Sequence, residues 1–241
     1  MKETQLIRFI NRAPVNKLKL ITLIPLFLTL FILLYPRFFI DENKDVNVIS
    51  LHPNIKNIEN ELKERLEKYD IKMYKKIHVF FPSSESDYNK MTLFMKKGTL
   101  GVNIGLFDIV VINPNIPITR KRLDILVHEI GHSYLKQEFG CFHTFTIENW
   151  KQEGFCEYIS ESSTFPREEG LSIFKDNESK TLELDKLRKS RYDYFTYRLV
   201  FEFLVKDKGM TLHQIFESDL DFELLKNEIR NKITAQHKTN L

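Results

Sequence analysis

The chain of 241 residues is 42% hydrophobic and 29% charged, with 8 glycines and 8 prolines. It is long enough for one domain of ordinary size plus appendages, and its composition excludes a disordered tail, a collagen-like chain and a disulfide-dense miniprotein. The net charge is +3, of which residues 1–19 carry +4 (five Lys and Arg, one Glu), so the remainder sums to −1 and provides no basic surface for nucleic acids.

An uncharged stretch follows the basic N-terminus. Residues 20–35 contain no charge, and residues 38–40 extend the apolar segment past Arg37. The whole segment reaches roughly the 20 residues that a helix needs to cross the hydrocarbon core of a membrane. We therefore predict one transmembrane helix over residues 20–40.

The charges on either side of this segment predict its orientation. Residues 1–19 are basic, whereas the polar segment 41–52, which we expect to be a stalk, contains Asp41, Glu42 and Asp45. Positive charge favours the cytoplasmic side, so the N-terminus is expected in the cytoplasm and the rest of the chain beyond the cell membrane. A cleavable signal peptide is the alternative, although residues 35–43 offer no small-residue cleavage site.

The remaining residues, 53–241, have the periodic patterns of an α+β domain. Hydrophobic runs that end before prolines predict strands at 76–81 and within 98–113. Helical spacing of apolar residues predicts helices at 53–69, 119–140, 146–160, 185–206, 212–216 and 221–233, and we also expect a helix in the polar stretch 83–97. The strands therefore come first and the main helices second.

The predicted helix 119–140 contains the sequence His128-Glu129-Ile130-Gly131-His132. Histidines four residues apart project from one helix face, so His128 and His132 can bind the same zinc ion. Glu129 lies beside that face, where it can take a proton from a water that the metal has acidified. Two ordinary surface histidines would give the same pattern, so a third ligand is needed to support a zinc site.

Glu153 is the candidate for this third ligand. It stands twenty-one residues after His132, within W-K-Q-E-G-F-C-E-Y at 150–158. A metzincin site would require Gly at position 135 and His or Asp at position 138, where this chain has Leu135 and Glu138. The two motifs together instead resemble the gluzincin zinc peptidases, the peptidase MA-like group. The resemblance implies a gluzincin-like zincin fold with a small mixed sheet, and it implies that Glu153 binds zinc.

Glu157 lies one helical turn beyond Glu153 on the same face. Zinc-binding histidines usually donate their second N–H to a carboxylate, so we expect Glu157 to orient His128 or His132. Thermolysin-like enzymes have an acidic residue at the same offset, which agrees with this role. A solvated surface glutamate is the alternative interpretation.

The resemblance also implies two features around the motifs. The strand material at 98–113 is similar to the edge strand that pairs with an extended peptide substrate in gluzincins. A tyrosine of the helix 185–206 is expected to donate a hydrogen bond to the oxyanion, which could contribute about 2–4 kcal/mol. Tyr194 is the first candidate for this donor and Tyr192 and Tyr197 stay open, while core packing is the alternative for all three.

The two cysteines, Cys141 and Cys156, leave several structures open. Cys156 stands where the gluzincin pattern has a small residue, and it could be packed in the core, bridged to Cys141 or bound to the metal as a thiolate. An exported domain would allow the bridge.

The sequence thus predicts a membrane-anchored zinc metallopeptidase that hydrolyses peptide or protein substrates with a zinc-activated water. The alternative is a non-catalytic, membrane-tethered peptide or protein binding domain with the same fold. Glu129 argues against it, because a purely structural zinc site needs no such base and normally has four protein ligands.

Overall fold

The computed structural model describes residues 46–50, 58–92, 99–104, 108–116, 121–162, 165–176, 179, 181 and 184–239. The basic segment 1–19 and the transmembrane helix predicted at 20–40 lie outside these residues. In the part of the chain that the structure describes, every helix is too short or too polar to span a membrane.

Four strands form a small mixed sheet. They are β1 (Val46–Ser50), β2 (Ile77–Phe81), β3 (Gly101–Ile104) and β4 (Ile109–Ile112), in the order β1-β2-β4-β3. β2 is parallel to both β1 and β4, while β3 pairs antiparallel with β4 and forms one edge of the described sheet. The strand material predicted at 98–113 therefore forms two strands rather than one.

β1 occupies residues that belong to the predicted stalk at 41–52. Its β-branched residues Val46, Val48 and Ile49 favour an extended backbone, and the strand pairs with β2 in register from Val46 with Ile77 to Ser50 with Phe81. Residues 46–50 of this predicted stalk thus form a strand of the sheet.

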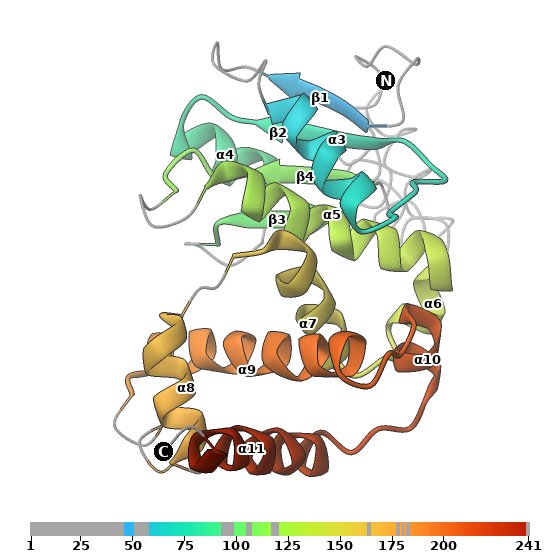
Figure 1. Cartoon of the computed structure of the whole chain (residues 1–241). Helices are drawn as coiled ribbons and strands as arrows, with labels where there is room; N and C mark the ends of the chain where they lie inside the picture. The colour runs from blue at the N-terminus through green and yellow to red at the C-terminus, as the bar shows by residue number, and fades with distance from the viewer. Residues whose placement is uncertain are drawn as a thin grey trace, which may run out of the picture. The chain divides into compact units, whose positions relative to one another are not determined.

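The helices follow the predicted order with two additions. Two helices lie between strands in the chain: α3 (Ile58–Lys68) follows β1, and α4 (Glu85–Met91) follows β2. The helices after the last strand are α5 (Arg122–Phe139), α6 (Cys141–Thr144), α7 (Asn149–Ser160), α8 (Arg167–Lys175), α9 (Lys186–Lys206), α10 (Leu212–Glu217) and α11 (Phe222–Thr239) (Figure 1). α8 lies between the helices predicted at 146–160 and 185–206, where we predicted no helix. Its Ile173 and Phe174 are buried, so tertiary packing stabilises a helix where Ser, Glu, Pro and Gly predict none.

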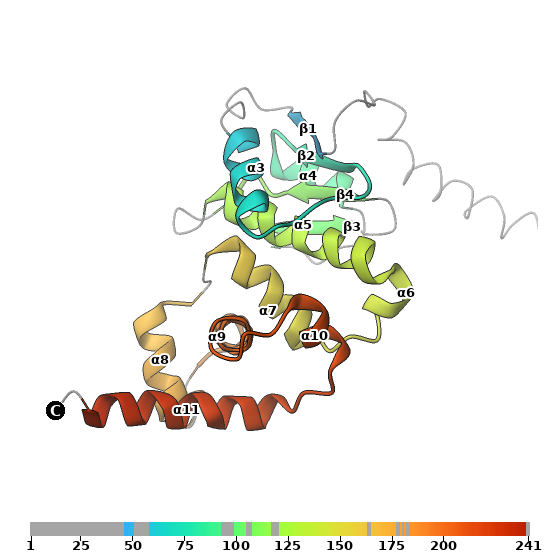
Figure 2. The same cartoon turned by 45° about the vertical axis from the view of Figure 1, so that its right-hand side comes forward.

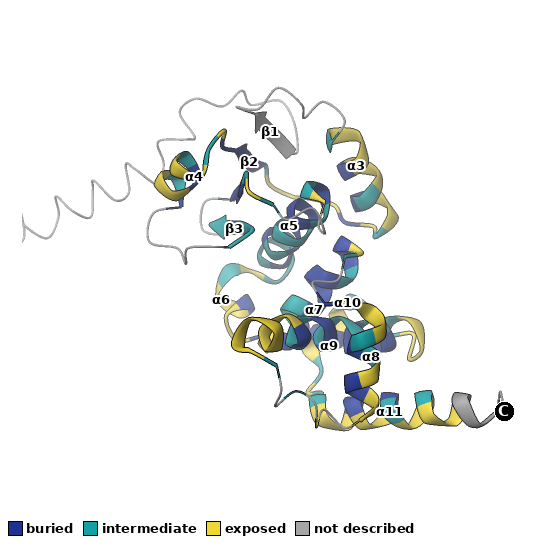
Figure 3. Ribbon diagram, turned by 90° about the vertical axis from the view of Figure 1, so that its left-hand side faces the viewer, coloured by how far each residue is buried: buried dark blue, intermediate teal, exposed yellow. Residues whose placement is uncertain are grey.

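Three helices form the centre of the domain. α5 packs against β3 and β4, and its apolar residues Leu126 and Ile130 are fully buried. α7 contacts α5 on one side and α9 on the other (Figure 2). Figure 3 shows that the buried residues gather where these helices meet, while exposed residues follow the outer side of α11.

Two glycines allow α7 to approach its neighbours closely. A Cβ atom on Gly131 of α5 would lie 2.9 Å from the Sγ of Cys156, and one on Gly154 of α7 would lie 2.7 Å from the carbonyl oxygen of Tyr197 on α9. The glycines of both sequence motifs thus lie at helix crossings. These crossings fix the position of Glu153 relative to α5 and α9.

We expect Gly154→Ala to lower the free energy of unfolding by about 1–2 kcal/mol. Alanine gains helix propensity over glycine, but its methyl group would press on the backbone of α9, which cannot rotate away as a side chain can. Urea unfolding of the variant and the wild type measures the difference. Gly131→Ala is the comparison, since its main neighbour is the Cys156 side chain, and Cys156→Ala in the same protein should relieve part of its cost. A Gly154→Ala protein as stable as the wild type would contradict the close crossing.

Candidate metal centre

The two histidines of the first motif lie on the side of α5 that faces α7. The apolar residues Leu126, Val127 and Ile130 hold the other side of the helix in the core, so the polar positions between them point away from it. The rings of His128 and His132 have centroids 5.1 Å apart and are inclined at 76°. Both side chains are largely buried, with exposed fractions of 12% and 18%.

Glu153 extends from α7 to both histidines. Its Oε2 lies 3.3 Å from the Nε2 of His128 and 3.6 Å from the Nε2 of His132. One donor atom from each of the three residues lies within 4.8 Å of the others. The structure therefore brings together the three residues that the sequence predicts as zinc ligands, although two of them are on a different helix from the third.

These positions fit a tetrahedral zinc ion. Zinc binds nitrogen and oxygen at about 2.0–2.2 Å, so the donors of a tetrahedral site are about 3.3–3.6 Å apart. The distances from Glu153 to the two histidine nitrogens fall in this range. The Oε2 of Glu153 is also buried and makes no hydrogen bond. A buried carboxylate needs a positive charge beside it, which either a bound metal ion or a protonated histidine can supply.

The charges of the group are strongly coupled. Burial disfavours the charged form of His128, but the carboxylates of Glu153 and Glu157 beside its ring outweigh burial and raise the pKa of His128 to about 10. Burial opposes ionisation of Glu153 as well, yet the two neighbouring imidazoles of His128 and His132 hold the pKa of Glu153 below its usual value. Glu153 is therefore an anion, the form in which a carboxylate binds metal.

Glu157 lies on the other side of the His128 ring. Its Oε1 is 3.2 Å from the Nδ1 of His128, and its side chain is only 1% exposed. Of the two histidines that the sequence left open, the structure thus pairs Glu157 with His128. This contact fixes the ring so that Nε2 faces Glu153.

Glu157→Gln is expected to weaken zinc binding about tenfold, the lower end of the range for a residue that orients a metal ligand. The side-chain oxygen of glutamine can still accept a hydrogen bond from the Nδ1–H of His128. Glutamine lacks the negative charge that makes the imidazole a stronger ligand of the metal. Competition with a zinc-sensitive dye measures the affinity, and Glu168→Gln, an exposed acid of α8, is the control. Equal affinity in both variants would contradict the orienting contact.

Glu129 lies between the histidines' helix and the edge strand. A Cβ atom on Gly101 of β3 would be 2.9 Å from its Oε1, so the absence of a side chain at Gly101 leaves room for the carboxylate. Asn103 of β3 donates from Nδ2 to the carbonyl oxygen of Glu129 at 2.8 Å and to the Oγ of Ser133 at 2.6 Å. Lys136 donates to the Oδ1 of the same asparagine. Sequence analysis did not find Gly101 and Asn103, because no local motif marks a contact between a strand and a helix.

Only one of the three candidate tyrosines lies beside the histidines. The ring of Tyr194 is 6.4 Å from that of His128, edge to face. Tyr197 contacts Tyr194 and Phe222 edge to face, whereas Tyr192 packs with Phe165 and Phe195 in a separate apolar cluster. Burial and the nearby glutamates raise the pKa of Tyr194 above its usual value, so its phenol keeps the proton that a hydrogen-bond donor needs.

The cysteines are both free in the structure. Cys156 is fully buried at the crossing with Gly131, and burial raises the pKa of its thiol well above the usual value. A neutral, packed thiol matches the small residue of the gluzincin pattern better than a thiolate ligand or a bridge to Cys141.

Comparison of the chain with protein-family models, curated proteins and solved structures gives no match. The resemblance to gluzincins therefore depends on the residues of the two motifs and stays a prediction.

Proposed function

We propose that the chain is a membrane-anchored, zinc-dependent metallopeptidase that hydrolyses peptide bonds with water. The observation that carries the proposal is the Oε2 of Glu153, which is buried without a hydrogen bond between two histidine nitrogens at distances suited to zinc. Three protein ligands with a glutamate next to them are typical of a catalytic zinc site, which keeps one position open.

The residues around the ligands would supply the rest of the chemistry. A bound zinc ion lowers the pKa of a water and polarises the scissile carbonyl. Glu129 would accept the proton that the attacking water loses, and would then transfer it to the amine nitrogen as the C–N bond breaks. Tyr194 would donate a hydrogen bond to the carbonyl oxygen as it gains negative charge.

The edge strand supports a peptide as the substrate. Among the described strands, β3 pairs with β4 alone, and its other side has backbone groups that can hydrogen-bond an extended chain. Gly101 of this strand contacts Glu129, so a peptide aligned along β3 would pass close to the proposed base. Peptide or protein substrates fit this arrangement.

The uncharged stretch 20–40 supports the membrane part of the proposal. The helix would cross the cell membrane once, with the N-terminus in the cytoplasm and the peptidase domain on the other side. The mass of the native protein tests retention of the anchor, because cleavage as a signal peptide would remove residues 1 to about 40. Protease digestion of intact cells then tests on which side the domain lies.

Removal of zinc provides the test of activity. We expect the full-length chain in detergent to cleave members of a mixed peptide library, to lose this activity after treatment with a chelator, and to regain it with one equivalent of zinc. Mass spectrometry of the library measures cleavage. Bound zinc without cleavage of any peptide would instead favour the binding domain, and absence of zinc binding would contradict the metal site itself.

A further inference from the structure

A concave site lies on α7 and α9, the helices that carry Glu153 and Tyr194. It is a pocket of about 240 Å³ at the place where the end of α7 and the start of α8 meet the middle of α9. The pocket has both charged and apolar walls, and is lined by Glu161, Arg167, Phe195, Arg198, Leu199 and Glu202.

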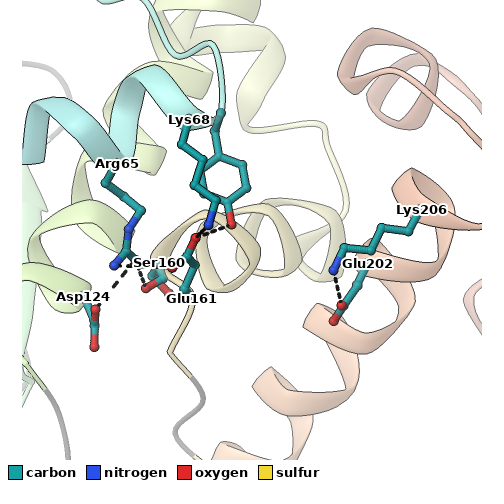
Figure 4. A network of polar contacts seen from close by, with 8 residues as sticks. Arg65, Lys68, Asp124, Ser160, Glu161, Glu202 and Lys206 are labelled. Atoms are coloured by element: carbon teal, nitrogen blue, oxygen red, sulfur yellow. Dashed lines mark hydrogen bonds and ion pairs between the residues drawn. The ribbon is translucent and has the colours of Figure 1, made fainter.

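The two carboxylates of the pocket both have cationic partners. Glu161 accepts hydrogen bonds from Lys68 and Tyr69, and its Oε2 lies 3.4 Å from Arg65. Figure 4 shows this group at the end of α7, with the second group, in which Lys206 donates to Glu202, across the space from it. Glu161 is thus paired through both oxygens, whereas Glu202 is paired through Oε1 and its buried Oε2 makes no hydrogen bond.

Arg198 differs from these residues. No hydrogen bond or ion pair of the described residues includes it, and its Nε is buried without a partner. Arg167 is mostly exposed and approaches Glu202 only to 3.9 Å. The pocket thus contains one guanidinium group that lacks a counter-charge and a second that is weakly held.

The charges around the pocket sum to an excess of positive charge. The pocket and the ion pairs that surround it contain five cationic side chains and three carboxylates, namely Arg65, Lys68, Arg167, Arg198 and Lys206 against Asp124, Glu161 and Glu202. The buried Nε of Arg198 lacks a hydrogen-bond acceptor, so an anion that enters the pocket would be stabilised there.

Short intervals along α9 and α7 separate the pocket residues from those of the metal centre. Arg198 follows Tyr194 by one turn on the same side of α9, a rise of about 6 Å, and helical side chains tilt toward the N-terminus, here toward Tyr194. Glu161 follows the ligand Glu153 by two turns, about 12 Å. An extended peptide advances about 3.3 Å per residue, so about two to four residues span this interval.

We propose that this pocket binds a carboxylate of the peptide substrate, with Arg198 and Arg167 as the binding groups. The inference rests on the proposed peptidase function and adds a preference for acidic substrates to it. The planar guanidinium of Arg198 can bind both carboxylate oxygens at once, and Phe195 and Leu199 offer apolar surface for the methylene groups of the substrate. An acidic side chain and the C-terminal carboxylate of a short peptide have the same chemistry.

The experiment compares matched peptides with the zinc-loaded full-length protein in detergent. One series places Glu or Gln at each of four positions on either side of the cleaved bond, and a second series ends in a free or an amidated C-terminus. We expect kcat/KM to be about tenfold or more higher for the carboxylate at one position. Preference at an internal position identifies an acidic side chain, and preference for the free terminus identifies the terminal carboxylate.

Three variants connect this preference with the pocket. Arg198→Gln should bring the ratio of kcat/KM between the carboxylate peptide and the matched amide peptide close to one. Arg167→Gln should lower the same ratio, and the fold should tolerate this change because the Arg167 side chain is 60% exposed. Lys189→Gln changes the net charge equally at an exposed position of α9 outside the pocket, and should leave the ratio unchanged. If Arg198→Gln does not fold, the ratio of Arg167→Gln decides.

The outcomes separate this inference from the proposed function. Zinc-dependent cleavage without a carboxylate preference, or a preference that both arginine variants retain, would overturn the acidic-substrate pocket and leave the peptidase intact. Failure of the wild type to cleave any peptide would overturn both.

Discussion

The variant Glu153→Ala is expected to purify without zinc, whereas the wild type holds one ion per chain. Removing the carboxylate leaves two histidines of α5 as the only ligands of the group. Loss of a residue that merely orients a ligand costs about 10–100-fold in affinity, so loss of a ligand should cost at least about 100-fold. Mass spectrometry of metal content after dialysis against a weak chelator measures the difference.

The effect should be specific to this carboxylate. Glu168→Ala, which removes an exposed acid from α8, should retain the wild-type zinc content. Circular dichroism shows whether Glu153→Ala keeps its helices, which we expect because His128 still has Glu157 as a partner. A folded Glu153→Ala protein with one tightly bound zinc would contradict the ligand set.

The ligand set illustrates what local sequence can predict. The spacing of His128 and His132 defines one face of α5 whatever the fold, and the pattern around Glu153 places it on a second helix. The distance between these helices is a tertiary property, and it depends on the glycine crossings at Gly131 and Gly154. Residue spacing along a single helix predicts neither crossing, so here the family resemblance supplied what periodicity could not.

The elements that sequence analysis missed depend on distant partners. β1 is short, and it becomes part of the sheet by pairing with β2, some thirty residues later in the chain. α8 has a composition typical of a loop and is stabilised by burial of Ile173 and Phe174. The contact of Gly101 with Glu129 and the pocket around Arg198 likewise join segments that are far apart in the sequence.

Which of the three tyrosines lies beside the histidines also depends on contacts between distant segments. Tyr192, Tyr194 and Tyr197 lie within six residues of one helix, so their identity alone does not tell which of them faces the histidines. The rotation of α9 about its axis decides, and the contact of Gly154 with the backbone of Tyr197 holds that rotation. The result places Tyr194 beside His128 and buries Tyr192 in another cluster.

The second large effect is expected for Glu129→Gln, which should keep zinc and lose activity. Glutamine has the size of glutamate and fits the space left by Gly101, so the fold and the three ligands should be unaffected. It cannot accept a proton from water, and general-base catalysis contributes about 10²–10⁴-fold, so kcat should fall by about this factor with little change in KM. Single-peptide kinetics with the zinc content measured on the same sample test both parts of the prediction.

The variant Tyr194→Phe gives a second fall in kcat with which the loss in Glu129→Gln can be compared. It removes one hydrogen-bond donor to the developing oxyanion and should lower kcat by about 10²–10³-fold, also with zinc retained. The two variants together separate catalysis from binding, because a domain that only binds peptides has no use for a proton acceptor at Glu129. A Glu129→Gln protein that cleaves peptides at the wild-type rate would show that another group takes the proton. Loss of zinc from that variant would instead mean that Glu129 belongs to the ligand set.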